Sequence, residues 1–266
     1  MLRLGLVGTG AMGSMIARSI DRGECPATLV GVTDLDGTRA RRLAASLASN
    51  PPVLPTAQVV EGCDLVVEAA GADALGDLLP RVIGGGKDIL VLSVGGLIDR
   101  EEQIAAAAAH RSRIYCPSGA IAGLDAVRAA AVGRIEGAAV TTRKPPAGLA
   151  GAPFFDDAAI DPLSLETATV VFEGSAREAC RAFPANINVS AALSLAGIGV
   201  DRTRVTIVAD PGIDRNIHRV EVWGDFGRMT AVTENVASEN PRTSRLAALS
   251  AIALIRRLSA PFQVGT

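Results

Sequence analysis

A glycine-rich turn near the start of the chain most constrains its fold. Residues 8–13 read GTGAMG, directly after the apolar run LRLGLV and directly before a segment with helical spacing of its apolar residues. This strand–turn–helix context separates a dinucleotide-binding turn from a chance G-x-G-x-x-G. Gly8 permits the tight turn, Gly10 lets a pyrophosphate approach the backbone, and Gly13 allows close packing of the helix on the strand.

The residues that follow the turn extend this cofactor site. Ala11 and Met12 complete the turn, and the N–H groups at the start of the helix attract an anion. A second apolar strand, ATLVGVTD, ends in Asp34, where a carboxylate can hydrogen-bond the adenosine ribose. A glycine-rich turn that binds nothing is the alternative, and the flanking strand and helix argue against it.

Three arginines leave the choice between NAD and NADP open. Asp34 favours NAD, but the segment DLDGTRARR places Arg39, Arg41 and Arg42 nearby, and any of them could receive a 2′-phosphate. A solvated helix face is the simpler interpretation of these arginines. We therefore expect NAD to be preferred and NADP to be tolerated.

Strand and helix patterns continue to alternate through the first half of the chain. The apolar runs DLVVEAAG, DILVLSVGG and RIYCPSG are separated by helical patterns near residues 72–83 and 100–110. Nearly continuous apolar strands that alternate with helices are typical of a parallel, doubly wound sheet. Ligands bind such sheets at the carboxyl ends of the strands, so the small residues there should border the cofactor. These residues are Ala70-Gly71, Gly95-Gly96 and Ser118-Gly119.

The pattern changes near Cys116. Strand-like runs now include GAAVTTRKPP and ATVVFEG, and after a helical pattern, NVSAALSLAGI, come RVTIVAD, IHRVEVWGDFG and RMTAVTENVA with no helix between them. Consecutive strands without helices indicate an antiparallel portion. The sequence thus predicts an α/β chain with an N-terminal Rossmann-type doubly wound parallel sheet and a second, α+β catalytic domain.

The last segment predicts a helix that returns to the first domain. Asn240 suits the N-cap and Pro241 the first helical position. An apolar stripe follows, made of Leu246, Leu249, Ala253 and Leu254. We expect residues 1–116 plus 241–266 to form the dinucleotide-binding domain, and residues 117–240 to form the catalytic and dimerisation domain.

Bulk composition excludes several kinds of partner. A net charge of −2 provides no attraction to nucleic acid or to an anionic membrane. No apolar run approaches the roughly 18–20 residues of a membrane span, and the N-terminus does not read as a signal peptide. The four cysteines are scattered, without a CxxC pair or clustered histidines, which indicates reduced thiols and no metal site. We expect a cytoplasmic protein.

One of the two histidines occupies a position that calls for an explanation. From residue 217 to residue 223 the pattern alternates as in a strand, and His218 shares its face with Val220 and Val222. A buried imidazole needs hydrogen-bond partners, so His218 is either satisfied in the core or poised in a cleft. The core is the commoner place for a lone histidine. The other, His110, reads as the C-terminal residue of an alanine-rich helix.

Several segments together resemble the L-aspartate dehydrogenase family. They are GxGxMG at the start, PSGAIAGLDA at 117–126, TTRKPP at 141–146, FPANINVSAALSLAGIG at 183–199, NIHRVEVWG at 216–224 and ENPRTS at 239–244. The resemblance covers nearly the whole chain. It implies a Rossmann domain joined to an α+β catalytic domain, generally as a homodimer. It also implies interconversion of L-aspartate with iminoaspartate, or with oxaloacetate and ammonia, using NAD or NADP, in support of pyridine-nucleotide biosynthesis.

The resemblance also assigns roles to single residues. It makes His218 the catalytic residue, and Ala122 and Asn188 contacts of the cofactor. Amine oxidation needs a proton acceptor near neutral pH, which suits a histidine with an ordinary pKa near 6.5. Asn188 also reads as a plain N-cap. Cationic side chains should bind the two carboxylates of the substrate, so we assign Lys144 to substrate binding, together with Ser118. The alternative for Lys144 is a solvated side chain without such a role.

Two other functions remain open at this stage. One is a different Rossmann oxidoreductase, acting on an aspartate-derived semialdehyde or hydroxy acid. The other is a non-catalytic dinucleotide sensor, which needs the glycine turn but has no use for His218.

Overall fold

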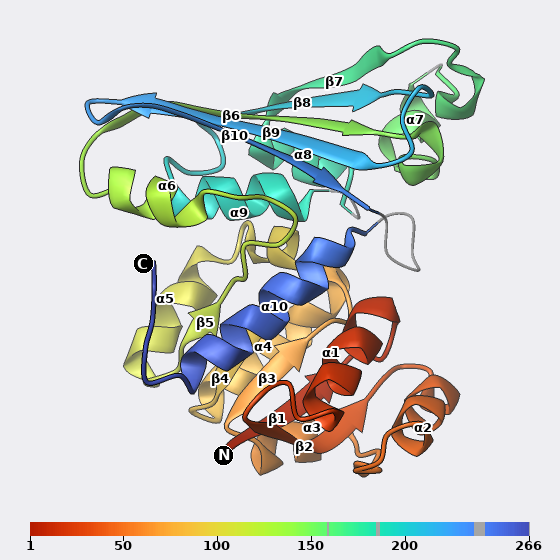
Figure 1. Ribbon diagram of the computed structural model, residues 1–266, viewed down its shortest axis with the longest axis vertical. Helices are drawn as coiled ribbons and strands as arrows, with labels where there is room; N and C mark the ends of the chain where they lie inside the picture. Colours follow the sequence, from red (N-terminus) through yellow and green to blue (C-terminus); the bar gives the residue numbers. More distant parts are fainter. Residues whose placement is uncertain (159, 185–186, 237–242, 266) are drawn as a thin grey trace. The chain divides into compact units, whose positions relative to one another are not determined.

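The chain forms two compact units in the computed structural model, which describes residues 1–158, 160–184, 187–236 and 243–265 (Figure 1). The first unit comprises Met1–Pro117 with Ala247–Gln263, and the second comprises Ser118–Leu246 with Val264–Thr266. Among these residues, no helix is both long and apolar enough to cross a membrane.

The first unit is built on a parallel five-stranded sheet in the order β2-β1-β3-β4-β5. Its strands are β1 (Leu2–Val7), β2 (Ala27–Thr33), β3 (Leu65–Glu68), β4 (Asp88–Val91) and β5 (Ile114–Tyr115). Because β1 pairs with β2 on one side and with β3 on the other, the strand order reverses at β1. The glycine turn follows β1 and therefore lies at this switch point, the place where open α/β sheets bind ligands. The predicted doubly wound sheet is confirmed.

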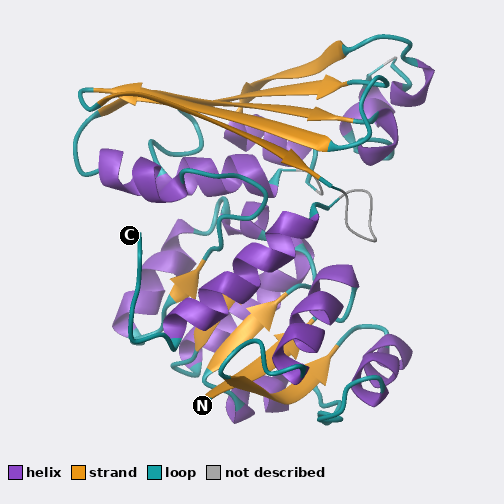
Figure 2. Cartoon of the chain, viewed as in Figure 1, coloured by secondary structure: helices purple, strands orange, loops and turns teal. Residues whose placement is uncertain are grey.

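Helices cover this sheet, and one of them comes from the end of the chain (Figure 2). They are α1 (Ala11–Asp21), α2 (Gly37–Ala45), α3 (Thr56–Gly62), α4 (Leu75–Gly84), α5 (Glu101–Ala109) and α10 (Arg245–Leu258). The apolar core joins Leu4 and Leu6 of β1 to Ile16 of α1 and to Ile252 and Ile255 of α10. The last helix is thus part of the core of the first unit.

The buried face of α10 differs from the predicted stripe. Its buried residues are Ala248, Ala251, Ile252 and Ile255, whereas Leu246, Leu249 and Ala253 are exposed and Leu254 is only partly buried. Alanines allow the helix to approach its neighbours closely, so the face with small residues turns inward. The predicted cap, Asn240 with Pro241, lies outside the described residues, and the described helix begins at Arg245.

The second unit contains a mixed five-stranded sheet in the order β10-β9-β6-β8-β7. Its strands are β6 (Ile135–Lys144), β7 (Thr169–Ser175), β8 (Thr203–Ala209), β9 (Asn216–Gly224) and β10 (Gly227–Asn235). Strands β9 and β10 form the expected antiparallel hairpin. However, β8 does not pair with β9: β6 lies between them, antiparallel to β9 and parallel to β8. The expected antiparallel portion is present, because β9 is antiparallel to both β10 and β6, and β8 is antiparallel to β7.

One face of this sheet is covered by helices. Along β9, Asn216, His218, Val220 and Val222 are buried, while the residues between them are at least partly exposed. Helices α6 (Leu124–Ala130), α8 (Ala176–Ala182) and α9 (Asn188–Ala196) lie on one side of the sheet (Figure 1). The short helix α7 (Phe154–Asp157) packs through Phe154 on Phe172 and Phe183. His218 therefore faces inward, as the alternation predicted.

Candidate functional site

Each of the three glycines in the turn suits its position for a different structural reason. Gly8 has a φ of +97°, and a side chain there would overlap the backbone of Ala69. A Cβ at Gly13 would overlap the carbonyl oxygen of Gly8. Gly10 is different, because the described chain places no atom within 4 Å of its Cβ position. The fold itself thus requires Gly8 and Gly13, whereas Gly10 keeps open space at the N-terminus of α1, as a close-lying pyrophosphate needs.

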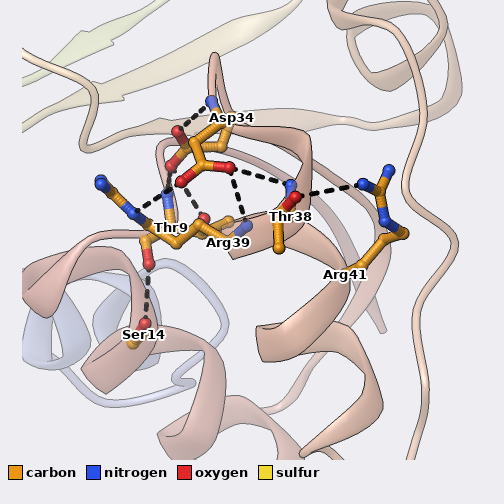
Figure 3. A network of polar contacts seen from close by, with 7 residues as sticks. Thr9, Ser14, Asp34, Thr38, Arg39 and Arg41 are labelled. Carbon is orange, nitrogen blue, oxygen red and sulfur yellow. Dashed lines mark hydrogen bonds and ion pairs between the residues drawn. The ribbon is translucent and has the colours of Figure 1, made fainter.

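Asp34 directly follows β2 and is held by hydrogen bonds to Thr9 of this turn (Figure 3). Its Oδ2 accepts hydrogen bonds from Thr9 N at 2.7 Å and Thr9 Oγ1 at 2.8 Å, and its Oδ1 accepts one from Asp36 N at 2.9 Å. Partial burial opposes ionisation, but these hydrogen bonds outweigh it and lower the pKa of Asp34. The side chain is therefore a fixed carboxylate, the group that binds ribose hydroxyls.

The nearby arginines contact their own helix. Arg39 Nε lies 3.9 Å from Asp36 Oδ2, and Arg41 Nη2 donates to Thr38 Oγ1 at 3.3 Å (Figure 3). Arg39, Arg41 and Arg42 are all exposed. Their arrangement is that of a solvated helix face.

A buried carboxylate, Glu68, organises the carboxyl ends of β3 and β4. Its Oε1 accepts hydrogen bonds from Ala70 N and Gly71 N at 2.8 and 2.9 Å and from Ser93 Oγ at 2.9 Å. Its Oε2 accepts one from Ser93 N at 3.0 Å. Burial raises the pKa of Glu68 despite these donors. The loops after the two strands, which the sequence placed at the cofactor, are thus joined by one side chain.

His218 lies on the covered face of the second sheet beside two other polar residues. Its ring Nδ1 is 3.0 Å from the hydroxyl Oγ1 of Thr142, its partner in register across β6 and β9. Lys144, two residues further along β6, shares that face. His218 is 2% exposed and Lys144 3% exposed.

Burial sets the protonation of both groups. It lowers the pKa of Lys144 to about 8. Burial first, and then the charge of Lys144, lower the pKa of His218 to about 3. The ordinary value near 6.5 assumed from the sequence is therefore wrong for this environment, and the imidazole is neutral at physiological pH. An anionic ligand bound to Lys144 would offset the charge of the lysine, one of the two causes that lower the pKa of His218, and would make the neutral imidazole a better proton acceptor.

The loop at 118–122 is attached to the same sheet. The carbonyl oxygen of Ala120 accepts hydrogen bonds from Thr233 Oγ1 at 2.8 Å and from Asn235 Nδ2 at 2.9 Å. Thr233 is the register partner of His218 on β10. The predicted residues Ser118 and Ala122 are thus carried by a loop that is fixed beside the histidine.

Asn188 lies in the first turn of α9. Ile187 occupies the N-cap of that helix, so the interpretation of Asn188 as a plain N-cap was wrong. The glycine turn and Asp34 belong to the first unit, whereas His218, Lys144, Ser118, Ala122 and Asn188 belong to the second.

Two polar residues that the structure places at the candidate sites, one in each unit, were not singled out from the sequence. Thr142 lies in the segment TTRKPP, and the available signal was its place two residues before Lys144, which puts both side chains on the same face of a strand. Glu68 was passed over as part of DLVVEAAG, where an acid directly before small residues was the available signal.

Comparisons with known proteins bear on the whole chain. The model of the family described as "Aspartate dehydrogenase, C-terminal" matches residues 125–258, and that described as "Homoserine dehydrogenase, NAD binding domain" matches residues 8–117. The chain is 48% identical to the L-aspartate dehydrogenase of Methanocella arvoryzae over 270 residues, with 100% of both chains covered. It belongs to the L-aspartate dehydrogenase family.

Other members of the L-aspartate dehydrogenase family agree with this assignment. The protein of that name from Bradyrhizobium diazoefficiens is 45% identical, over 100% of this chain and 94% of its own. The crystal structure of aspartate dehydrogenase from Thermotoga maritima superposes with a TM-score of 0.75 at 25% identity and covers 100% of both chains. The expected family and the two-part fold are confirmed, with a nicotinamide-binding first unit.

Proposed function

We propose that this protein is an NAD-dependent L-aspartate dehydrogenase that interconverts L-aspartate with iminoaspartate, or with oxaloacetate and ammonia. The observation that carries the proposal is a neutral, buried imidazole on the same sheet face as a buried lysine. This pair offers one group for proton transfer and one for a substrate carboxylate. The names of the relatives support the same substrate.

In the proposed mechanism each residue has one task. Lys144 attracts a carboxylate of the substrate, and Ser118 in the neighbouring loop donates a further hydrogen bond. His218 accepts a proton from the amino group before the hydride leaves Cα and releases that proton to solvent, and it then accepts one from the water that adds to the imine carbon. In the opposite direction it returns these protons. A bound nicotinamide would supply the hydride acceptor.

The cofactor is assigned to the glycine turn and to the loop and helix of the second unit. Gly8, Gly10, Ala11, Met12 and Gly13 would hold the pyrophosphate, and Asp34 the ribose, with Ala122 and Asn188 as further contacts. The fixed carboxylate of Asp34 and the solvated arginines support NAD over NADP.

This assignment implies a separate role for each of the two domains. We propose that residues 1–116 with 241–266 act as the dinucleotide-binding domain and residues 117–240 as the catalytic and dimerisation domain. A cytoplasmic homodimer that supplies iminoaspartate to pyridine-nucleotide synthesis is the setting that the family resemblance implies.

Steady-state assays test this proposal. Purified protein should consume NADH when oxaloacetate and ammonium are both present. NADH consumption without ammonium would instead identify a hydroxy-acid dehydrogenase. Tight NADH binding without turnover on oxaloacetate or on an aspartate-derived semialdehyde would identify a dinucleotide sensor.

A further inference from the structure

The hydroxyl beside His218 is not explained by the roles assigned above. Thr142 is 4% exposed, and its Oγ1 lies 3.0 Å from the ring Nδ1. Within the described residues, neither this hydroxyl nor the imidazole makes another side-chain hydrogen bond.

We propose that Thr142 is a positioning residue that acts through His218. Its hydroxyl holds Nδ1, which leaves Nε2 as the nitrogen that exchanges a proton with the substrate. This inference rests on the proposed function, because it requires His218 to be the acid–base group.

The sheet holds the hydroxyl in place. Thr142 and His218 face each other across antiparallel strands, where side chains of directly opposed residues are neighbours. A β-branched side chain has few χ1 rotamers, so the hydroxyl keeps its direction. The imidazole ring is thereby fixed by backbone pairing that runs from Gly137 to Arg143 on β6 and from Ile217 to Trp223 on β9.

A hydroxyl suits this position because it is neutral and has both hydrogen-bonding functions. It accepts a hydrogen bond when Nδ1 carries a proton and donates one when Nδ1 is bare. For Nε2 to be the free base, Nδ1 carries the ring proton and Nδ1–H donates to Oγ1, and this hydrogen bond persists when Nε2 takes a proton from the substrate and the ring becomes an imidazolium. A carboxylate in the same place would stabilise the imidazolium before substrate binds, and the ring would no longer be a free base.

The test compares three variants at or next to this position. Thr142→Val removes the hydroxyl and keeps the shape, whereas Thr142→Ser keeps the hydroxyl. We expect Thr142→Val to lower kcat by about 10- to 100-fold, the effect of a misplaced catalytic group. The KM for oxaloacetate and the NADH Kd should stay near wild type, and Thr142→Ser should retain most of kcat. Thr141→Val is the matched control, because Thr141 points to the opposite face, and it should leave kcat unchanged.

A double-mutant cycle shows whether Thr142 acts through the histidine. In a His218→Ala background, Thr142→Val should cause no further loss, since the group that it positions is gone. A further tenfold loss there would overturn the inference, and so would a wild-type kcat for Thr142→Val. If His218→Ala itself keeps full activity, the proposed function fails instead. Thr142→Ala replaces Thr142→Val in these comparisons if the valine variant does not fold.

Ring 15N NMR gives a readout that does not depend on turnover. The chain has two histidines, so His110→Asn leaves His218 as the single imidazole signal. Removing the hydroxyl should change the 15N shift of Nδ1, whereas Thr142→Ser should preserve it. An unchanged Nδ1 shift in Thr142→Val would show that the hydroxyl does not hold the ring.

Discussion

A methyl group at Gly10 should separate cofactor binding from folding. The backbone at Gly10 has φ −67° and ψ −166°, which alanine adopts without strain, and the described chain leaves the Cβ position clear to 4 Å. Alanine is a poorer N-cap than glycine, but it also reduces the entropy of the unfolded chain, and the two effects oppose each other within about 1 kcal/mol. The melting temperature of Gly10→Ala should therefore lie within about 2–4 °C of wild type.

The same methyl group should obstruct the pyrophosphate. An extra methyl in a close-packed contact costs about 1–3 kcal/mol, which corresponds to a loss of about 5- to 150-fold in affinity. Titration of the protein with NADH, followed by fluorescence or calorimetry, measures this loss. A Kd within about twofold of wild type would refute the reasoning that places the pyrophosphate against Gly10.

Two further glycines provide the controls. Gly84 also has a clear Cβ position but ends α4, so Gly84→Ala should leave NADH affinity unchanged. Gly13→Ala should behave in the opposite way, because its methyl group would overlap the Gly8 carbonyl. It should lower the melting temperature together with NADH affinity.

Other substitutions test the remaining assignments. His218→Ala should lower kcat by about 10²–10⁴-fold with unchanged NADH Kd; a variant that melts early but turns over normally would instead make His218 a core residue. Asp34→Ala should weaken NADH binding and spare or improve NADPH binding, and equal losses for both cofactors would show that Asp34 does not contact the ribose. Lys144 is charged below its pKa of about 8, so the KM for oxaloacetate should rise above that pH. In Lys144→Met this KM should be high at every pH, and a wild-type-like rise in the variant would contradict the assignment.

The sequence predicted the local elements of this fold better than their order in space. Alternation along β9 placed His218 on the buried face, and the succession of apolar strands and helices in the first half of the chain predicted the parallel sheet. The neighbours of β8 were not predictable from adjacency, because β6 enters the sheet between β8 and β9. Long-range pairing of this kind depends on the packing of whole strands rather than on any local signal.

For the candidate site, residue types were predictable but their electrostatics were not. The pKa of His218 depends on its burial and on the charge of Lys144, which only the register of β6 and β9 brings together. In α10, the helical period was predicted correctly, but the wrong face of the helix was predicted to be buried. The leucines were expected to face inward, whereas Ala248 and Ala251 are the residues that do so. Hydrophobicity alone does not reveal where a close approach favours small side chains.

The place of α10 in the first unit has a consequence for how the protein is made. Strands β1 to β5 precede the stretch Ser118–Leu246 along the chain, yet their core includes Ile252 and Ile255, which are translated after that stretch. Domains generally fold in order from the N-terminus during synthesis. Here the continuous stretch Ser118–Leu246 can fold before α10, which completes the core of the first unit, has been synthesised. The first unit therefore completes its core only after the segment that forms the second unit has been synthesised.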